Sequence, residues 1–450
     1  MANHAITLSF ALLFLLQAFH LSRSQPYIGI NYGIVADNLP PPSASAKLLQ
    51  STSIQKVRLY GADPTIIKAL ANTNIGIVIG VANGDIPGIA SDPSTAKGWI
   101  NSNVSPYYPA SNIIIIAVGN EVMLSGDENL MTSLLPAMKN LQSALGEAGA
   151  DKIKVSTVHA MAVLAQSDPP SAGSFNPSYG DVMTTLLAFL KSTGSPFMIN
   201  PYPYFAYQSD PRPDTLAFCL FQPNAGRVDS GTKINYMNMF DAQVDAVHSA
   251  LDKAGFKGVE IVVAETGWPY KGDDNEVGPS LENAKAYNGN LVKHLKSMVG
   301  TPLMPGKSVD TYLFALYDED LKPGPTSERS FGLFKPDLTM TYDVGLSGSS
   351  SAAQAPTNVA ASPTTSAVTP TSSPFGLAPS TTTTPTIATP NATSPVTTVN
   401  PTGVATGFAA GSPPKHGHSH APSNAAISLR KHVTTCGSIL VAFTSTLMFL

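Results

Sequence analysis

Two carboxylates stand at the ends of the most apolar stretches of this chain. The stretch "NIIIIAVGNEV" includes Glu121, and "VEIVVAETGWP" includes Glu265. In both stretches, the residues before the acid are typical of a strand buried on both faces. Two carboxyl groups can cleave a glycosidic bond, because one protonates the leaving oxygen while the other acts on the opposite face of the sugar. Glu121 and Glu265 are therefore candidate catalytic residues. The alternative is a pair of solvated loop glutamates.

An amide and several aromatic side chains accompany the two acids. Asn120 directly precedes Glu121, where its amide can hydrogen-bond a sugar 2-hydroxyl. The aromatic residues that follow the expected strands are Tyr202, Tyr204, Phe205 and Trp268. Their flat faces can stack on pyranose rings, so the set favours a saccharide ligand. For each of them taken alone, ordinary core filling remains open.

The acids need a rigid frame, and the sequence predicts a barrel. Eight short apolar, β-branched runs begin at Tyr27, Lys56, Gly76, Ile113, Ile153, Phe197, Val259 and Asp310. Segments of helical character separate them, which predicts parallel pairing through crossovers. Eight such units within residues 25–343 predict a closed (β/α)8 TIM barrel, with an open doubly wound sheet as the alternative. Active sites of such barrels form at the carboxyl ends of the strands, where both acids fall. His159 also ends an expected strand, and a structural or supporting role is favoured for it.

Charge and cysteine content limit the classes of ligand and partner that we expect for this protein. Residues 25–343 contain all 30 acidic residues but only 22 of the 26 lysines and arginines, a formal charge of about −8. A negative domain without basic clusters argues against nucleic acid as a partner. Cys219 and Cys436, the two cysteines, are too far apart in such different surroundings to indicate a disulfide framework or a metal site. We expect neither a metal nor a cofactor.

Both ends of the chain resemble processing signals. Residues 1–24 combine an apolar run with small residues, which predicts a secretory signal peptide, a membrane anchor being the alternative. Residues 344–424 are rich in Ser, Thr and Pro, and they predict a disordered, glycosylated stalk. Sequons for N-glycosylation occur at Asn103 and Asn391.

The last residues match a GPI-attachment signal. Small residues at 423–426 precede a polar spacer, Ile427 to Thr435, and an apolar tail, Cys436 to Leu450. Asn424 is the predicted attachment site, Ser423 the alternative, and residues 425–450 the removed propeptide. A tail-anchored helix is the competing interpretation. The pattern predicts a protein held on the outer face of the plasma membrane by a GPI lipid, facing the cell wall.

Five motifs then resemble one family. They are "GINYG", "VGNE", "NPYPYF", "ETGWP" and "YDEDLKPG…SERSFGLF", and in this order they resemble the plant β-1,3-glucanases of glycoside hydrolase family 17. The resemblance implies a (β/α)8 barrel that cleaves internal β-1,3-glucosidic bonds of glucans such as callose with retention. It implies Glu121 as acid/base and Glu265 as nucleophile. Supporting roles fall on Glu319, Lys322 and Glu328, and Tyr32 corresponds to the tyrosine lining the cleaved subsite.

Two other functions stay open at this stage. A β-1,3-glucan transglycosylase would share the covalent intermediate, so the sequence does not separate it from a hydrolase. A catalytically inactive glucan-binding wall protein would lack the acids, yet both acids and their expected supports are present. Many anchored relatives carry a cysteine-rich glucan-binding module after the barrel, which this chain lacks. We therefore expect retention at the wall to depend on the anchor and on the barrel's own groove. Separately, we expect a monomer.

Overall fold

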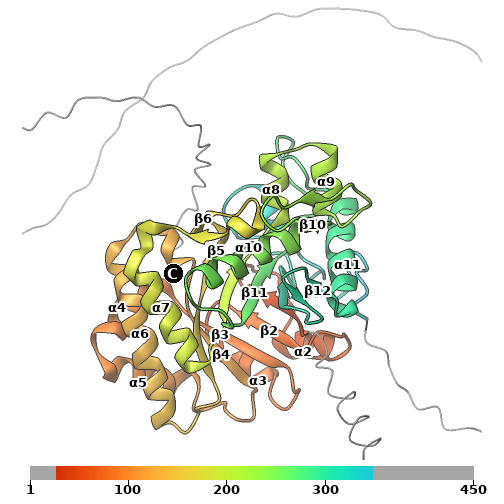
Figure 1. Cartoon of the computed structure of the whole chain (residues 1–450). Helices are drawn as coiled ribbons and strands as arrows, with labels where there is room; N and C mark the ends of the chain where they lie inside the picture. The colour runs from red at the N-terminus through yellow and green to blue at the C-terminus, as the bar shows by residue number, and fades with distance from the viewer. Residues whose placement is uncertain (1–26, 348–450) are drawn as a thin grey trace, which may run out of the picture. The chain divides into compact units, whose positions relative to one another are not determined.

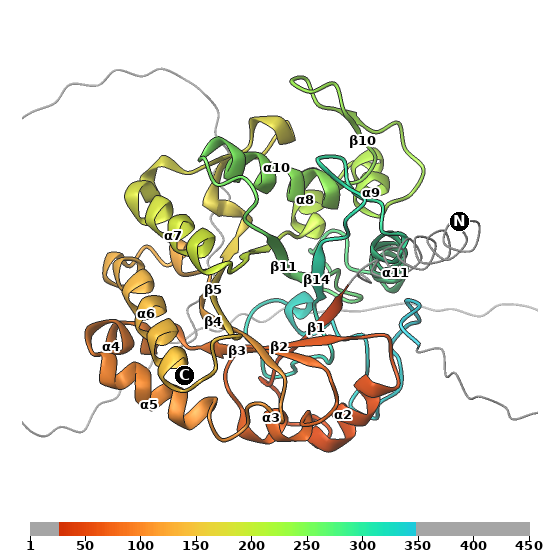
Figure 2. The ribbon, with the colours of Figure 1, turned by 60° about the horizontal axis from the view of Figure 1, so that its bottom comes forward.

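The computed structural model describes residues 27–347, and a closed barrel of eight parallel strands lies at its centre (Figures 1 and 2). Around the barrel the strands follow the order β1-β14-β11-β8-β5-β4-β3-β2. They are β1 (Ile28–Tyr32), β2 (Lys56–Leu59), β3 (Gly76–Val81), β4 (Ile113–Asn120), β5 (Lys154–Ala160), β8 (Phe197–Asn200), β11 (Ile261–Thr266) and β14 (Asp310–Leu313). The predicted TIM barrel is confirmed, and each of its strands falls within a run expected from the sequence.

Helices surround the strands, as the view in Figure 2 makes plain. They are α2 (Pro42–Gln50), α3 (Pro64–Ala69), α4 (Ile86–Ser91), α5 (Pro93–Asn103), α6 (Glu128–Glu147), α7 (Gly180–Thr193), α8 (Pro203–Ser209), α9 (Pro213–Cys219), α10 (Met239–Lys253) and α11 (Leu281–Ser297). Within residues 27–347, β14 is followed by no α-helix but by the 3-10 helix η6 (Thr326–Arg329). The eighth βα unit expected from the sequence is thus incomplete in the described chain.

Among the described residues, three small antiparallel sheets form in the loops. They pair β6 (Leu164–Gln166) with β7 (Ser174–Phe175), β9 (Arg227–Val228) with β10 (Asn235–Tyr236), and β12 (Gly300–Thr301) with β13 (Met304–Pro305). The β9–β10 hairpin belongs to the long segment between β8 and α10, which also forms α8 and α9. These insertions enlarge the loops without interrupting the barrel.

Local sequence signals start several of these helices. Asp63 precedes Pro64, and its carboxylate accepts the backbone N–H groups of Thr65 and Ile66 at the start of α3. A proline in the first turn fits there, because that N–H has no partner within the helix. Asp127 caps α6 in a similar way, by accepting from the N–H of Leu130. Short polar signals therefore fix where the chain turns from strand to helix.

The core has two layers, which correspond to the two faces of every strand. Inside the barrel, a small cluster is formed by Val78, Ile115, Ala117, Val158, Met198, Val262, Ala264 and Tyr312. Outside the barrel, a much larger cluster fills the space between the strands and the helices. Residues within one strand alternate between these clusters: Ala264 faces inward, whereas Val263 packs among the helices. This alternation decides which polar side chains reach the catalytic end.

The folded part extends past the boundary predicted at residue 343. Leu346 is fully buried, and its carbonyl accepts the N–H of Ser53 at 2.7 Å. Ser347 forms a bridge with Thr52. Composition suggested a boundary at Val344 because the following residues are small and polar. It could not indicate that Val344 and Leu346 fill the outer core.

Several predictions concern residues outside 27–347. The signal peptide, the stalk beyond Ser347, Asn391, Ser423, Asn424 and the apolar tail all lie there. Within the described range, no helix has the length and apolar character needed to cross a membrane. Asn103, the other sequon, is the last residue of α5, and its amide donates to the carbonyl of Trp99.

His159 should make the fold sensitive to acid. Its ring stacks on Phe197 with 4.7 Å between centroids, and neither ring nitrogen has a hydrogen-bond partner among the described residues. Burial lowers the pKa of His159 to about 3. The unfolded chain therefore binds this proton below pH ~6.5, and stability is lost as the pH falls from there towards 3. Relative to a His159→Phe variant, the wild type should lose about 1.4 kcal/mol of unfolding free energy per pH unit in that window.

Urea titrations at several pH values measure this difference. Phe197→Leu is the control, because it disturbs the same contact without changing a titrating group, so its effect should not vary with pH. A constant difference between wild type and His159→Phe from pH 7 to pH 4 would contradict the assignment.

Candidate active site

Glu121 directly follows a break in the strand that carries it. Along β4, three steps from Ala117 to Asn120 match only two steps on β5, so β4 contains one extra residue. Gly119 lies in this bulge with φ +69°, a conformation that glycine adopts at little cost. Glu121 itself has φ +53°, and its N–H donates to the carbonyl of Val158. The bulge turns the end of β4 towards the barrel opening.

A side chain from the neighbouring loop holds this turn. Asn83 accepts the backbone N–H of Asn120 at 2.9 Å and donates to its carbonyl at 3.1 Å. The backbone next to Glu121 is thereby bonded at both its donor and its acceptor. A catalytic group needs this kind of support, because small displacements of a reacting atom reduce the rate steeply.

Glu265 lies within a second bulge, in β11. Three steps from Val263 to Thr266 match two steps on β14. Val263 and Thr266 both face the surrounding helices, since Thr266 hydrogen-bonds the hydroxyl of Tyr287 in α11. Without the extra residue, strict alternation would direct Glu265 towards the helices. With it, the Glu265 side chain turns to the barrel opening, where it remains 8% exposed.

A buried arginine joins the two acid-bearing strands. Arg58 of β2 is 1% exposed. Its guanidinium donates to Glu265 Oε1 at 2.5 Å and to Asn120 Oδ1 at 2.8 Å. Tyr202 donates its hydroxyl to the other oxygen of Glu265 at 2.9 Å. Both oxygens of Glu265 are thus hydrogen-bonded, and these bonds fix the orientation of its carboxyl group.

Glu121 has the opposite electrostatic surroundings. Burial raises the pKa of Glu121, and the negative charge of Glu265 raises it further, against the opposing effects of Asn200, Arg58 and Lys322. The Asn200 amide donates to Glu121 Oε1 at 2.8 Å. The pKa of one carboxyl group is therefore raised, while its neighbour is paired with the Arg58 guanidinium. Such a division is the requirement for a proton donor beside a nucleophile.

Two further acids and a lysine lie next to the pair. Lys322 Nζ lies 3.0 Å from Glu328 Oε2 and 4.8 Å from the ring centroid of Phe314. Burial alone would lower the pKa of Lys322, but the charges of Glu328 and Glu319 outweigh it and raise that pKa. Glu319 is 6% exposed; burial raises its pKa, and its carboxylate accepts the N–H of Val35 at 3.0 Å.

The second glycine of "GINYG" makes room for Glu319. A Cβ added to Gly33 would lie 2.2 Å from the Glu319 carboxyl group. A side chain at position 33 would therefore displace the Glu319 carboxyl group from its present position. The loop after β1 and the segment after β14 are therefore packed directly against each other at the site.

The predicted aromatic contacts are only partly available. Tyr202 and Phe205 are partly exposed, with 5.2 Å between their ring centroids. Trp268 is fully buried, and its indole N–H donates to the carbonyl of Gly278. Tyr204 is also buried, packed against Trp268. The prediction that Trp268 contacts substrate is therefore wrong for this structure, because its ring has no open face.

Tyr32 is likewise not at the opening. It is 3% exposed, and its hydroxyl hydrogen-bonds Ser45 of α2 at 3.0 Å. Alternation in β1 explains this, because Tyr32 shares the outward face with Ile30. The neighbouring Asn31 faces inward instead and donates to the carbonyl of Ala264. Tyr32, predicted to line the cleaved subsite, is therefore not exposed at the opening in this structure.

Arg58 and Asn200 were missed from the sequence. Both occur in expected strands, in "KVRLY" and "FMIN". A charged or amide side chain near the carboxyl end of an otherwise apolar strand is a signal that could have identified them, because buried polar groups require partners. His159, in contrast, is buried against Phe197, as expected for a structural residue.

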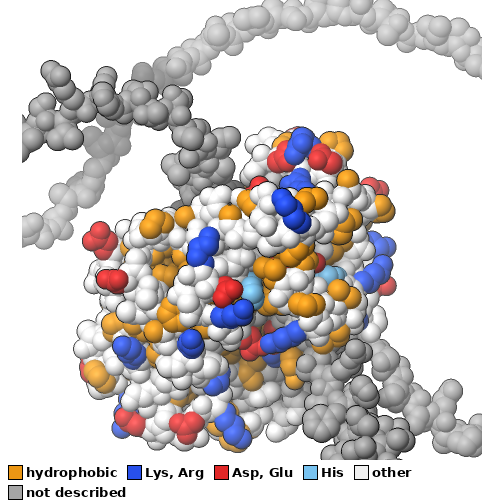
Figure 3. Space-filling model, viewed as in Figure 1, with side chains coloured by type: hydrophobic (Ala, Val, Ile, Leu, Met, Phe, Trp, Pro, Cys, Tyr) orange, Lys and Arg blue, Asp and Glu red, His pale blue; other side chains and the backbone are white. Residues whose placement is uncertain are grey.

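Surface charge, possible metal ligands and the one described cysteine bear on whether this protein binds charged partners or metals. On the face shown in Figure 3, acidic and basic side chains are interspersed, and neither kind gathers into a patch. Within residues 27–347, no group of three His, Cys, Asp or Glu side chains could hold a metal ion. Cys219 is buried and forms no disulfide; its sulfur donates to the carbonyl of Pro203 at 3.4 Å.

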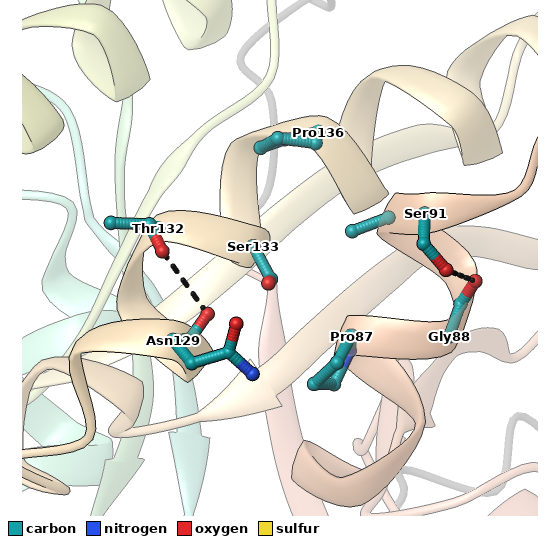
Figure 4. A pocket seen from close by; sticks show the side chains of 8 residues that line it. Pro87, Gly88, Ser91, Asn129, Thr132, Ser133 and Pro136 are labelled. Carbon is teal, nitrogen blue, oxygen red and sulfur yellow. Dashed lines mark hydrogen bonds between the residues drawn. The ribbon is translucent and has the colours of Figure 1, made fainter. Parts of the chain in front are cut away.

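A separate surface hollow of about 590 Å³ lies between α4 and α6 (Figure 4). Its lining is Pro87, Gly88, Ala90, Ser91, Asn129, Thr132, Ser133 and Pro136. None of these side chains titrates near neutral pH. The hollow therefore offers no acid–base chemistry, and the catalytic groups converge elsewhere, at the carboxyl ends of the strands.

An eight-stranded barrel with two carboxyl groups at its carboxyl end, one with a raised pKa and one paired with a buried arginine, has the layout of a glycoside hydrolase. The sequence pattern of glycosyl hydrolases family 17 matches residues 28–346, and the chain belongs to this family.

Named relatives are consistent with this membership. Glucan endo-1,3-beta-glucosidase 7 of Arabidopsis thaliana is 68% identical over 354 residues, which are 78% of this chain and 70% of that protein. Glucan endo-1,3-beta-D-glucosidase of Olea europaea is 65% identical over 341 residues, 76% of this chain and 74% of that protein. Among solved structures, a beta-1,3-glucanase and allergen of Cryptomeria japonica pollen matches with a TM-score of 0.68 and 44% identity, over 72% of this chain and 99% of that one.

The Arg58–Glu265 pair should be strongly coupled in stability. Arg58→Met should lower the unfolding free energy by about 3–5 kcal/mol, because it leaves a buried carboxylate without its cation. In a Glu265→Gln background, Arg58→Met should lower the unfolding free energy by clearly less, because no buried carboxylate is then left without a cation. Chemical denaturation of the two single variants and the double variant measures the coupling.

Arg212→Met is the matched control. Arg212 pairs with Asp210 and Asp214, but its side chain is 63% exposed, so the loss should be much smaller than for Arg58→Met. If Arg58→Met cost the same in both backgrounds, the pair would not be the stabilising contact.

Proposed function

We propose that this protein hydrolyses internal 1,3-β-glucosidic bonds of β-1,3-glucans with retention of configuration. The observation that carries the proposal is the pair of carboxyl groups at bulged strand ends: burial raises the pKa of Glu121, and Arg58 and Tyr202 hold both oxygens of Glu265. The named glucosidases and the glucanase among the relatives support the substrate class. No cofactor is needed for this chemistry.

The proposed reaction proceeds in two displacements. Glu121 protonates the glycosidic oxygen while the Glu265 carboxylate attacks the anomeric carbon, so the bond to the leaving sugar breaks and a covalent glycosyl-enzyme forms. Glu121, now ionised, removes a proton from water. The water then attacks the anomeric carbon and releases Glu265. Arg58 and Tyr202 hold Glu265 before the attack and bind the charge that returns to it afterwards.

Arg58 also prepares Asn120 for a sugar hydroxyl. A guanidinium can only donate hydrogen bonds, so Asn120 must direct its carbonyl oxygen to Arg58. Its amide NH2 group is then left to donate towards the 2-hydroxyl of the sugar being cleaved. Tyr202 and Phe205 supply the partly exposed aromatic surface for neighbouring sugars. Glu319, Lys322 and Glu328 act through charge.

Product analysis on linear β-1,3-glucan tests the proposal. The wild type should release short oligosaccharides from chain interiors, with the β configuration in the first product. Glu265→Gln should abolish turnover, because the amide cannot form the glycosyl-enzyme, while circular dichroism remains unchanged. Substantial hydrolysis by that variant, or release of glucose alone from chain ends, would contradict the proposal.

The variant Glu121→Ala separates the two roles. Loss of a general acid should reduce turnover of glucan by about 10²–10⁴-fold. Substrates with good leaving groups should still react, and azide should restore turnover by attacking the glycosyl-enzyme in place of water. If Glu121→Ala and Glu265→Gln lost turnover equally, and azide restored it in neither, the assignment of Glu121 as acid/base and Glu265 as nucleophile would be contradicted.

We also propose that the enzyme is exported and held by a GPI lipid at Asn424, with Ser423 as the alternative site, on the outer face of the plasma membrane. The small residues, the polar spacer and the apolar tail of residues 423–450 support this proposal. The barrel would then act on wall glucan as a monomer. N-glycosylation at Asn103 and Asn391 belongs to the same proposal.

Phospholipase treatment tests the anchor. A phosphatidylinositol-specific phospholipase C should release active enzyme from intact cells, because it cuts the lipid from a GPI-linked protein. A version lacking residues 436–450 should fail to be anchored. If the enzyme stayed on the membrane and peptide mapping detected Cys436 to Leu450, the tail would be a transmembrane anchor instead.

A further inference from the structure

The cation beside the catalytic acids depends on a very short element. Glu328, the partner of Lys322, lies in η6, which has four residues. Pro325 precedes η6 and provides no side-chain cap. A single 3-10 turn has little stability of its own, because its hydrogen bonds are few and poorly aligned. Something outside η6 must therefore hold Glu328 in place.

Two acids of the loop between β11 and α11 bind the start of η6. Asp273 Oδ2 accepts the N–H of Thr326 at 3.1 Å, and Glu276 Oε2 accepts the N–H of Ser327 at 3.2 Å. The hydroxyls of the same two residues donate to the second oxygens of these carboxylates. Each acid thus makes a two-pronged contact. Together they satisfy the N–H groups that a helix start leaves open.

The loop that carries these acids is itself held in place by hydrogen bonds and close packing. Asp273 N–H donates to Glu276 Oε2 at 2.8 Å, so the two acids share one network. A Cβ added to Gly272 would meet Pro279 at 2.6 Å and Glu276 Oε2 at 3.0 Å. The buried Trp268 holds the far end of the loop through the carbonyl of Gly278.

The same loop starts from the strand that carries the nucleophile. Glu265 is the last residue but one of β11, which ends at Thr266. A few residues further on, the backbone N–H of Tyr270 donates to the carbonyl of Ser330, the residue directly after η6. Glu265 and Glu328 are therefore held by one continuous frame.

We propose that Asp273 and Glu276 are positioning residues for catalysis: they fix η6 and, through Glu328, the ammonium group of Lys322 beside Glu121 and Glu265. The proposal rests on the hydrolase function proposed above. Neither acid touches the reacting groups in this structure, so both act only through η6. A purely structural role would alter stability without altering how the catalytic acid titrates.

The direction of the titration effect follows from the charges. Burial raises the pKa of Glu121, and Lys322 opposes that shift. If η6 loosens and Lys322 moves away, the pKa of Glu121 rises further. Because Glu121 must be protonated, the alkaline limb of kcat/KM should then move to higher pH. The kcat itself should fall roughly tenfold, the scale of one charge-assisted hydrogen bond lost at the transition state.

Glu276→Gln and Asp273→Asn test this with little change of shape. Asp274→Asn is the matched control, since Asp274 lies in the same loop and is exposed, and it is not among the acids that bond η6. We expect lower kcat and a shifted alkaline limb for the first two variants, and wild-type values for the control. In a Lys322→Met background, Glu276→Gln should reduce kcat little further. Wild-type kinetics for Glu276→Gln and Asp273→Asn, or a full loss in that background, would overturn the proposal.

A measurement that does not depend on turnover can distinguish a failure of this positioning role from a failure of the proposed hydrolase function. The lysines can be reductively methylated with ¹³C-formaldehyde, so that the Lys322 signal can be titrated by NMR. Glu328 raises the pKa of Lys322, so Glu276→Gln should lower that pKa, whereas Asp274→Asn should leave it unchanged. If the wild type did not cleave β-1,3-glucan, the proposed function would fail while this titration still decided the positioning role. An unchanged Lys322 titration would overturn it.

Discussion

A buried guanidinium is the interaction on which the catalytic end of this barrel depends. Arg58 is almost completely withdrawn from water, and it bonds both the Glu265 carboxylate and the Asn120 side chain. Removing such a cation from water is costly, and the cost is offset only when the partner charge lies at close range in good geometry. The arginine therefore fixes the distance between the ends of β2, β4 and β11. The other features of the site adapt to this fixed point.

Two bulges make that contact possible. A regular strand sends neighbouring side chains to opposite faces, so a barrel strand has one row for its interior and one for its helices. The extra residues in β4 and β11 reverse the alternation of inward and outward side chains at the last positions of these strands. Asn120 and Glu265 consequently face the opening, although regular alternation would direct them to the helices. The apolar rows below fix the strands firmly enough for the irregular ends to be tolerated.

The sequence predicts the frame better than the site. Eight apolar runs and the segments between them were sufficient for the barrel, because period and length decide such elements. The acids were found because a charge at the end of an apolar run is conspicuous. Tyr32 and Trp268 were assigned wrongly because side-chain direction depends on alternation and packing in three dimensions. Arg58 and Asn200 were missed because a single polar residue in a strand reveals its importance only once its partners are known.

The way the fold closes has a further consequence. Ser53 and Thr52, which bind Leu346 and Ser347, come just before β2 begins. They therefore lie at the amino-terminal end of the strands, whereas Glu121 and Glu265 lie at the carboxyl ends. The last described residues are thus fixed at the end of the barrel opposite its active opening. A load applied to the chain after Ser347 would pull first on the Ser347–Thr52 bridge and then on the Ser53–Leu346 hydrogen bond. The loops that hold the acids would be shielded from that force by the whole length of the barrel.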